Sequence, residues 1–137
     1  MEQSIEVNAS ATAMWDVLTN PKKIAVYLYG TETITTWEPG AEIIFQGEYE
    51  GQTYKDKGRV LEVELNKRLK YSYWSGFSGL EDLPENYFDV TYIIEDKGDS
   101  CKFTWAQSGF KNEESLAHSE NNMPNMLKVM KELAEKG

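Results

Sequence analysis

The feature that most constrains the fold is one long amphipathic segment at the C-terminal end of the chain. Residues 112–136 carry apolar side chains spaced at i, i+3, i+4 and i+7, as on one face of an α-helix. They are Met123, Met126, Leu127, Met130, Leu133 and Ala134. Because Pro124 cannot donate the helical hydrogen bond, we expect the helix to begin or kink there, or to break around His118. A helix with one apolar face needs a second layer to cover that face.

The middle of the chain supplies that layer, because its apolar residues alternate with polar ones as in half-buried strands. The expected strands cover residues 4–8, 31–37, 43–49, 54–65, 69–74, 87–95 and 101–107. Turn sequences separate them, such as Glu38-Pro39-Gly40 and residues 96–99. Two short helices are expected after the first strand, one capped by Ser10 and one opened by Pro21.

This order of elements predicts an α+β domain with a helix-grip fold. A curved antiparallel sheet would wrap around the long C-terminal helix, with the two short helices placed after the first strand. A chain of 137 residues suits one domain spanning residues 1–137. Such a domain buries enough surface to fold without a disulfide or a metal.

Charge and composition exclude several classes of protein. The formal net charge of −9 would repel nucleic-acid phosphates, so we expect no nucleic-acid partner. No apolar run approaches the roughly 20 residues that span a bilayer, so we expect no membrane insertion. The polar N-terminus does not resemble a signal peptide, and Cys101 is the single cysteine. We therefore expect a soluble, cytoplasmic protein.

Several segments resemble, in the same order, the activator of heat-shock protein 90 ATPase homologue family of the SRPBCC superfamily, which also includes START and birch-pollen-allergen-like proteins. The segments are MWDVLTNPKKI at 14–24, WEPG at 37–40, GRVLEV at 58–63 followed by RLKYSYW at 68–74, FTWAQSGF at 103–110, and MPNML at 123–127. The sequence departs from the family pattern at Tyr27 and Met123, where relatives often carry tryptophan. The resemblance implies a cavity between sheet and helix that in related proteins takes apolar or aromatic small molecules.

The sequence gives little sign of catalytic chemistry. The only histidine, His118, and the only cysteine, Cys101, lie on different expected elements, so we predict no metal site and no cofactor. His118 is interpreted as a surface residue and Cys101 as a small buried hydrophobic residue. The glycine-rich residues 76–79 lack the lysine and the following helix of a phosphate-binding loop. Glu62 and Glu64 are interpreted as part of a solvated sheet face. No catalytic residue is predicted.

Aromatic residues are the most informative part of the composition, at 12% of the chain. A concave sheet lined with them either frames a cavity or is filled by an ordinary aromatic core. The predicted cavity residues are Trp15, Tyr71, Tyr73, Tyr92, Phe103, Trp105, Gln107, Met123, Met126 and Met130. Gln107 would either orient a polar group of a ligand or form structural hydrogen bonds with tyrosine hydroxyls. The entrance is expected between the loop at 75–86 and the region of Tyr27 and Tyr29.

Three functions remain open at this stage. The first is a protein that binds a hydrophobic small molecule, aromatic or acyl, without its own chemistry. The second is a protein–protein module resembling a co-chaperone, whose acidic surface would favour a basic partner. The third is an enzyme that acts through the shape of its cavity, which would leave little trace in the sequence.

Overall fold

The computed structural model describes residues 1–28, 30–74, 81–110 and 112–136, apart from the side chain of Tyr49. The elements in chain order are β1 (Glu2–Val7), α1 (Ala11–Thr19), α2 (Pro21–Tyr27), β2 (Glu32–Ile34), β3 (Glu42–Tyr49), β4 (Gln52–Glu64), β5 (Arg68–Trp74), the 3₁₀ turn η2 (Pro84–Asn86), β6 (Phe88–Asp96), β7 (Cys101–Ser108) and α3 (Glu113–Lys136).

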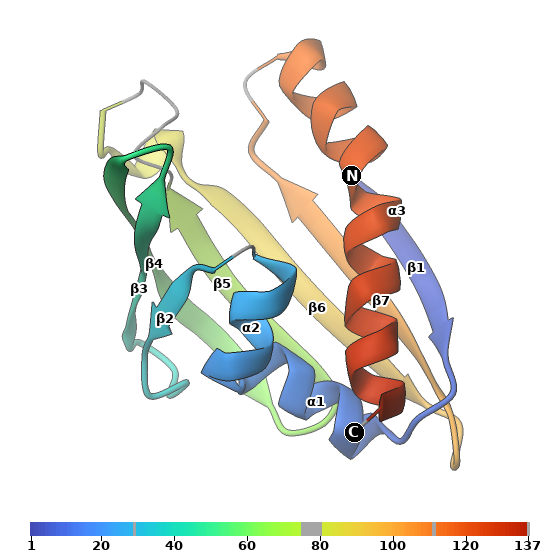
Figure 1. The fold of residues 1–137 in the computed structure, drawn as a ribbon. Coiled ribbons are helices and arrows are strands. Elements are labelled where there is room, and N and C mark those ends of the chain that lie inside the picture. The colour runs from blue at the N-terminus through green and yellow to red at the C-terminus, as the bar shows by residue number, and fades with distance from the viewer. Residues whose placement is uncertain (29, 75–80, 111, 137) are drawn as a thin grey trace.

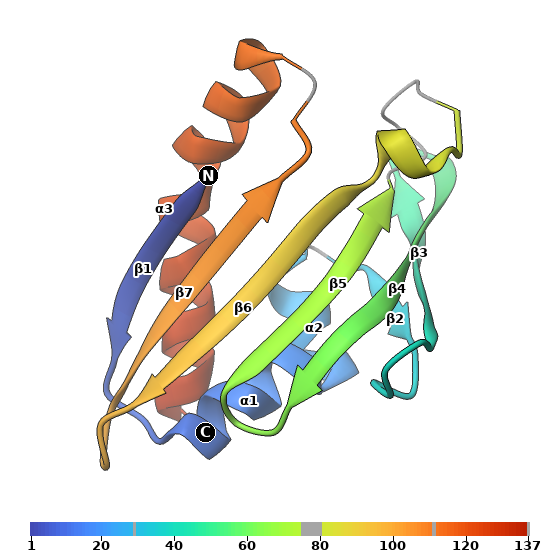
Figure 2. The ribbon, with the colours of Figure 1, turned by 180° about the vertical axis from the view of Figure 1, so that it is seen from behind.

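Seven strands of the described chain form one antiparallel sheet in the order β1-β7-β6-β5-β4-β3-β2. Strands β2 to β7 follow one another as a meander, and β1 pairs with the last of them, with Ile5 opposite Phe103. The helices α1, α2 and α3 all lie on one face of this curved sheet (Figure 1), and the view from behind shows the other face without a covering helix (Figure 2). The predicted helix-grip fold is confirmed.

Local side-chain hydrogen bonds begin the two short helices where the sequence predicted them. The Oγ atom of Ser10 accepts a hydrogen bond from the backbone N–H of Ala13 over 3.2 Å. The side chain of Asn20 accepts from the N–H of Lys22 over 3.0 Å, and Pro21 is the first residue of α2. These bonds satisfy backbone donors that the first helical turn leaves without partners.

The pairing of the neighbouring strands β4 and β5 contains an irregularity. The register between the two strands shifts between Val60 and Glu62, which marks a bulge, and a bulge increases the local twist. Two residues earlier, Gly58 approaches β5 so closely that a Cβ atom there would lie 1.8 Å from the carbonyl oxygen of Ser72. Glycine at this position permits the close approach of the two strands.

The core lies between the concave face and the helices. Alternate residues of β6 and β7 point into it, including Val90, Tyr92, Ile94, Phe103 and Trp105, as their pattern predicted. Met14 and Leu18 of α1 belong to the same buried cluster, as do Leu127 and Met130 of α3. The predicted burial of Cys101 is confirmed.

The expected kink of the C-terminal helix is confirmed, whereas one predicted strand boundary is wrong. Glu113–Lys136 is one helix with Pro124 inside it, so the helix neither begins at Pro124 nor breaks around His118. Figure 1 shows its axis changing direction between the orange and the red turns. The strand expected at 31–37 is shortened to Glu32–Ile34, because Trp37 leaves the sheet with φ of 59° and its indole Nε1 donates to the carbonyl of Thr19 over 3.0 Å.

None of the helices in the described ranges has the length and apolar character to cross a membrane.

Candidate functional site

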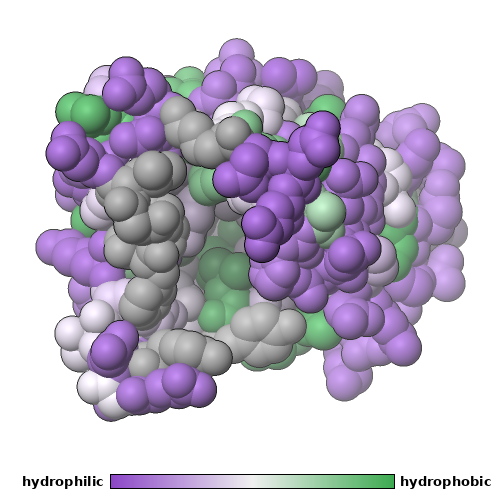
Figure 3. All heavy atoms as spheres, turned by 90° about the horizontal axis from the view of Figure 1, so that it is seen from above, coloured by the Kyte–Doolittle hydropathy of each residue, from purple (hydrophilic) through white to green (hydrophobic). Residues whose placement is uncertain are grey.

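A cavity of about 540 Å³ lies between the N-terminal half of α3 and the concave face of the sheet. Figure 3 views this end of the molecule from above and shows a hollow with hydrophobic atoms at its floor. The residues that line the cavity are Leu28, Thr31, Phe45, Asp56, Tyr71, Tyr73, Val90, Trp105, Gln107, His118, Ser119, Asn122, Met123, Asn125 and Met126. They come from the segment that follows α2, from strands β3 to β7 and from α3.

The structure brings six of the ten predicted cavity residues together around this space. They are Tyr71, Tyr73, Trp105, Gln107, Met123 and Met126. Phe103 and Met130 do not line the cavity, because both are completely enclosed by the core. Tyr92 is also in the core, packed against the rings of Tyr71 and Trp105. Trp15 lies on α1 and packs against the edge of the core away from the cavity.

The aromatic walls pack against one another in tilted and edge-on arrangements. The ring centroids of Phe45 and Tyr73 are 5.5 Å apart with an interplanar angle of 73°, and those of Phe45 and Tyr71 are 6.1 Å apart. Tyr92 supports Trp105 from behind, with centroids 4.8 Å apart. Such contacts hold large side chains in fixed orientations. The cavity therefore has a preformed apolar wall.

Tyr71, which lines the cavity, and Tyr92, which does not, have paired hydroxyl groups that are buried. The Oη atoms of Tyr71 and Tyr92 are 2.8 Å apart and share a hydrogen bond. Burial raises the pKa of both hydroxyls well above the ordinary value of 10, and burial together with the nearby Tyr71 does the same for the pKa of Tyr27. These hydroxyls stay protonated at neutral pH, so each can donate a hydrogen bond.

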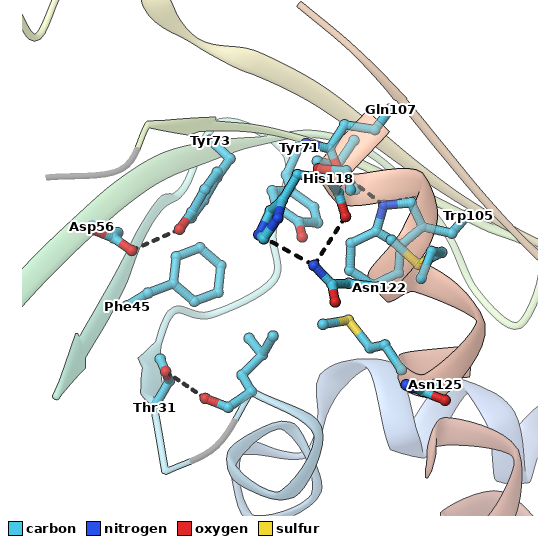
Figure 4. A pocket seen from close by; sticks show the side chains of 15 residues that line it. Thr31, Phe45, Asp56, Tyr71, Tyr73, Trp105, Gln107, His118, Asn122 and Asn125 are labelled. Carbon is cyan, nitrogen blue, oxygen red and sulfur yellow. Dashed lines mark hydrogen bonds between the residues drawn. The ribbon is translucent and has the colours of Figure 1, made fainter. Parts of the chain in front are cut away.

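Two polar pairs face the cavity from opposite parts of the sheet (Figure 4). On β4 and β5, Tyr73 Oη donates to Asp56 Oδ2 over 2.6 Å. On β7, the indole Nε1 of Trp105 donates to Gln107 Oε1 over 3.1 Å. Gln107 therefore forms a structural hydrogen bond, but its partner is a tryptophan and not the predicted tyrosine hydroxyl. Gln107 also lines the cavity.

The helix α3 contributes the third polar group. His118 Nε2 lies 3.2 Å from Asn122 Nδ2, and the same amide nitrogen donates to the backbone carbonyl of His118 over 2.9 Å. His118 is exposed, as predicted, but it also lines the mouth of the cavity. Its placement there was not predicted, because a residue at the end of an apolar stripe can face either solvent or a hollow.

Asp56 and Phe45 are the most informative residues that the sequence analysis missed. Asp56 has the same strand phase as Val60, and Val60 is completely buried. A charged residue in phase with a buried one in a strand is the signal that could have placed Asp56 on the concave face. Phe45 is its cross-strand partner on β3 and could then have been assigned to the same wall.

The predicted entrance is only partly described. Tyr27 itself is buried, whereas its neighbours Leu28 and Thr31 line the cavity. Thr31 Oγ1 donates to the carbonyl of Leu28 over 2.8 Å, which fixes the turn after α2. Tyr29 and residues 75–80 lie outside the described residues.

The remaining candidates for chemistry are at other places in the fold. In the described ranges, no three His, Cys, Asp or Glu side chains are grouped so that they could hold a metal ion. Burial, and then the nearby Asp96 and Glu6, raise the pKa of the Cys101 thiol above its ordinary value. Glu62 and Glu64 are exposed, which confirms a solvated face, and Glu62 accepts a hydrogen bond from Arg68 over 3.0 Å.

A family model and several solved structures match this chain over almost its whole length. A family model described as activator of Hsp90 ATPase homolog 1-like protein matches residues 8–135. The solution structure of a protein from Cytophaga hutchinsonii is 32% identical, with a TM-score of 0.83 over 99% of this chain and 94% of that one. No curated protein matches the sequence.

Two further structures share the fold at lower identity. A crystal structure from Mesorhizobium loti is 18% identical, with a TM-score of 0.76, and the match covers 99% of this chain and 98% of that chain. The Aha1 dimer from Colwellia psychrerythraea is 14% identical, with a TM-score of 0.74, and the match covers 98% of this chain and 95% of that chain. At these identities the likeness concerns the fold alone.

Proposed function

We propose that this chain, which belongs to the family of activator of Hsp90 ATPase homolog 1-like proteins, binds a small hydrophobic molecule between the sheet and α3. The observation that carries this proposal is the cavity of about 540 Å³. Small-molecule sites usually enclose about 300–1,000 Å³. A core filled by its own aromatic residues would be close-packed and would leave far less space.

The chemistry of the walls supports the same function. Phe45, Tyr71, Tyr73 and Trp105 offer flat apolar surfaces, and their mutual contacts limit the rearrangement that binding would require. The thioether side chains of Met123 and Met126 lie opposite on α3 and can adapt to different ligand shapes. Polar groups at Asp56, Gln107 and Asn122 would orient a bound molecule.

Mass spectrometry of the purified protein under native conditions provides the first test. A co-purified ligand should appear as added mass that disappears on denaturation. A neutral apolar dye, N-phenyl-1-naphthylamine, provides the second test through its fluorescence increase in an apolar site. A single saturable binding event is expected. The absence of both added mass and dye binding would contradict the proposal.

A matched pair of tryptophan variants locates the binding event. Trp105→Phe replaces an indole that lines the cavity by a smaller ring. Trp15→Phe makes the same chemical change on α1, outside the cavity. Trp105→Phe should weaken dye binding by about fivefold, which corresponds to the loss of about 1 kcal/mol of contact. Trp15→Phe should leave the affinity unchanged. Equal effects of the two variants would place the dye elsewhere.

The description of the matched family favours a second candidate, a protein–protein module that acts on an Hsp90-type chaperone. The net charge of −9 would assist association with a basic surface, and raising the salt concentration would weaken it. The ATPase rate of a purified Hsp90 is measured with and without this chain at low and high salt. A salt-sensitive increase in rate supports the module, and an unchanged rate contradicts it.

A further inference from the structure

One wall of the cavity carries a carboxyl group among apolar side chains. Asp56 on β4 is only 6% exposed and lines the cavity. Phe45 on β3 is its cross-strand partner, so both side chains point to the same side of the sheet. Tyr73 Oη donates to Asp56 Oδ2 over 2.6 Å. This hydrogen bond and the neighbouring ring fix the position of the carboxyl group (Figure 4).

The electrostatic surroundings of Asp56 favour a positive charge in the cavity. Among the described residues that line it, there is no lysine and no arginine. The other polar side chains on the wall are hydroxyls, amides and His118 of α3. Charges interact more strongly in a cavity with little water than in bulk solvent. A carboxylate at this wall therefore attracts a cation and repels an anion that enters.

Aromatic rings next to the carboxyl group strengthen this selectivity. Phe45, Tyr71 and Tyr73 lie on the same wall as Asp56, and Trp105 lies farther along the sheet. The face of an aromatic ring attracts a cation within about 6 Å of its centroid. The same rings also accept the apolar body of a ligand. A carboxyl group beside several rings suits a molecule that has both a positive charge and a hydrophobic part.

The geometry points to an amphipathic amine as the ligand class: a hydrophobic molecule with a protonated amino group. The ammonium group donates to Asp56, and the apolar body packs against the aromatic wall and the methionines of α3. Hydrophobic carboxylates, including fatty acids, are disfavoured at the same position. This inference rests on the proposed function and deepens it, because it assigns the chemistry of the molecule that the cavity binds.

The test compares three molecules of one shape: 2-naphthylmethylamine, 2-naphthylmethanol and 2-naphthoic acid. Their dissociation constants are measured by isothermal titration calorimetry at pH 7.5. The amine should bind about ten- to hundredfold more tightly than the alcohol, as expected for a hydrogen bond to a charged group. The acid should bind more weakly than the alcohol. Equal affinities of amine and alcohol would overturn the inference and leave the proposed function intact, whereas no binding of any of the three would overturn both.

A matched pair of variants assigns the preference to Asp56. Asp56→Asn keeps an acceptor for Tyr73, and Asp89→Asn changes the net charge equally at an exposed position on β6. Only Asp56→Asn should abolish the preference for the amine, while both variants still bind the alcohol. A preference that survives in Asp56→Asn would overturn the assignment. If this variant does not fold, the affinities of wild type for the amine and the alcohol are measured at 0.05 and 0.5 M NaCl. A preference for the amine that disappears at the higher salt concentration reflects attraction by the whole acidic protein and overturns the inference. A preference that persists supports it.

Discussion

The side-chain amide of Gln3 on β1 donates a hydrogen bond to the backbone carbonyl of Glu120 on α3, over 3.1 Å. In a regular helix this carbonyl would accept from the N–H four residues later, but that residue is Pro124, which has no N–H. Gln3 therefore supplies the donor that the proline removes. The bond also ties the first strand to the helix at the point where its axis bends.

We predict that Gln3 and Pro124 are energetically coupled. Gln3→Met keeps the length of the side chain but removes the donor, and it should lower the free energy of unfolding by about 1 kcal/mol. In a Pro124→Ala background the restored N–H satisfies Glu120, so the same change should cost much less. Urea unfolding of the two single variants and the double variant measures the coupling. Equal costs of Gln3→Met in both backgrounds would show that the two residues are not coupled.

The sequence could not reveal this relationship, because the two partners are separated by 117 positions. It did reveal features that depend on neighbours in the chain. Ser10 and Pro21 begin their helices through contacts within three residues, so those helices were predicted correctly. The strand expected to reach Trp37 failed for the opposite reason, since the indole bonds to Thr19 in another element and draws the backbone out of the sheet.

The cavity residues also differ in whether their placement depends on neighbours in the chain or on distant contacts. Alternation along β5 and β7 was enough to place Tyr71, Tyr73 and Trp105 on the concave face. It could not tell that Phe103, two residues before Trp105, is fully enclosed, because the distinction depends on where α3 crosses the sheet. Asp56 was missed because acidic residues in strands usually face solvent, and its burial depends on Phe45 and Tyr73 from neighbouring strands.

The hydroxyl pair of Tyr71 and Tyr92 gives a second prediction. Removing either hydroxyl by Tyr→Phe leaves the other buried without its partner, and each single change should cost about 1–3 kcal/mol. The double variant should be less destabilised than the sum, because no polar group is then left unsatisfied. Thermal and urea unfolding measure the three variants. Tyr87→Phe is the control, since its hydroxyl bonds to the exposed Asp82. Strict additivity of the two buried changes would contradict the pairing.

The close approach of β4 and β5 at Gly58 gives a third prediction. A Cβ atom there would lie 1.8 Å from the carbonyl oxygen of Ser72, so Gly58→Ala must push β4 away from β5. We expect a loss of about 3 kcal/mol in the free energy of unfolding, together with weaker dye binding, because Asp56 and Tyr73 lie on these strands. Gly98→Ala is the control: it adds a Cβ in open space at φ of 90° and should cost only about 1 kcal/mol. A Gly58→Ala protein as stable as the control would show that this close approach does not require glycine.

Glu135 near the end of α3 gives a prediction that depends on pH. Its Oε2 atom accepts a hydrogen bond from Lys131 and another from the backbone N–H of Asn8 over 2.8 Å. These two bonds, Lys131 first, lower the pKa of Glu135 below its ordinary value of 4.5. A carboxylate in the last turn is disfavoured by the helix dipole, so the two bonds must outweigh that effect. The bond from Asn8 joins the C-terminal end of α3 to the segment between β1 and α1.

Because the pKa is lower in the folded than in the unfolded protein, the charge of Glu135 stabilises the fold above the unfolded pKa. This stabilisation is lost as the pH falls through the folded pKa. Glu135→Gln keeps an acceptor for Asn8 but removes the charge. It should therefore reduce the free energy of unfolding at pH 7, and the difference from wild type should shrink as the pH approaches 3. Urea unfolding across this range measures the difference, with Glu132→Gln, an exposed position on the same helix, as the control. A deficit of equal size at pH 7 and pH 3 would mean that the shape of the side chain, and not its charge, holds the helix end in place.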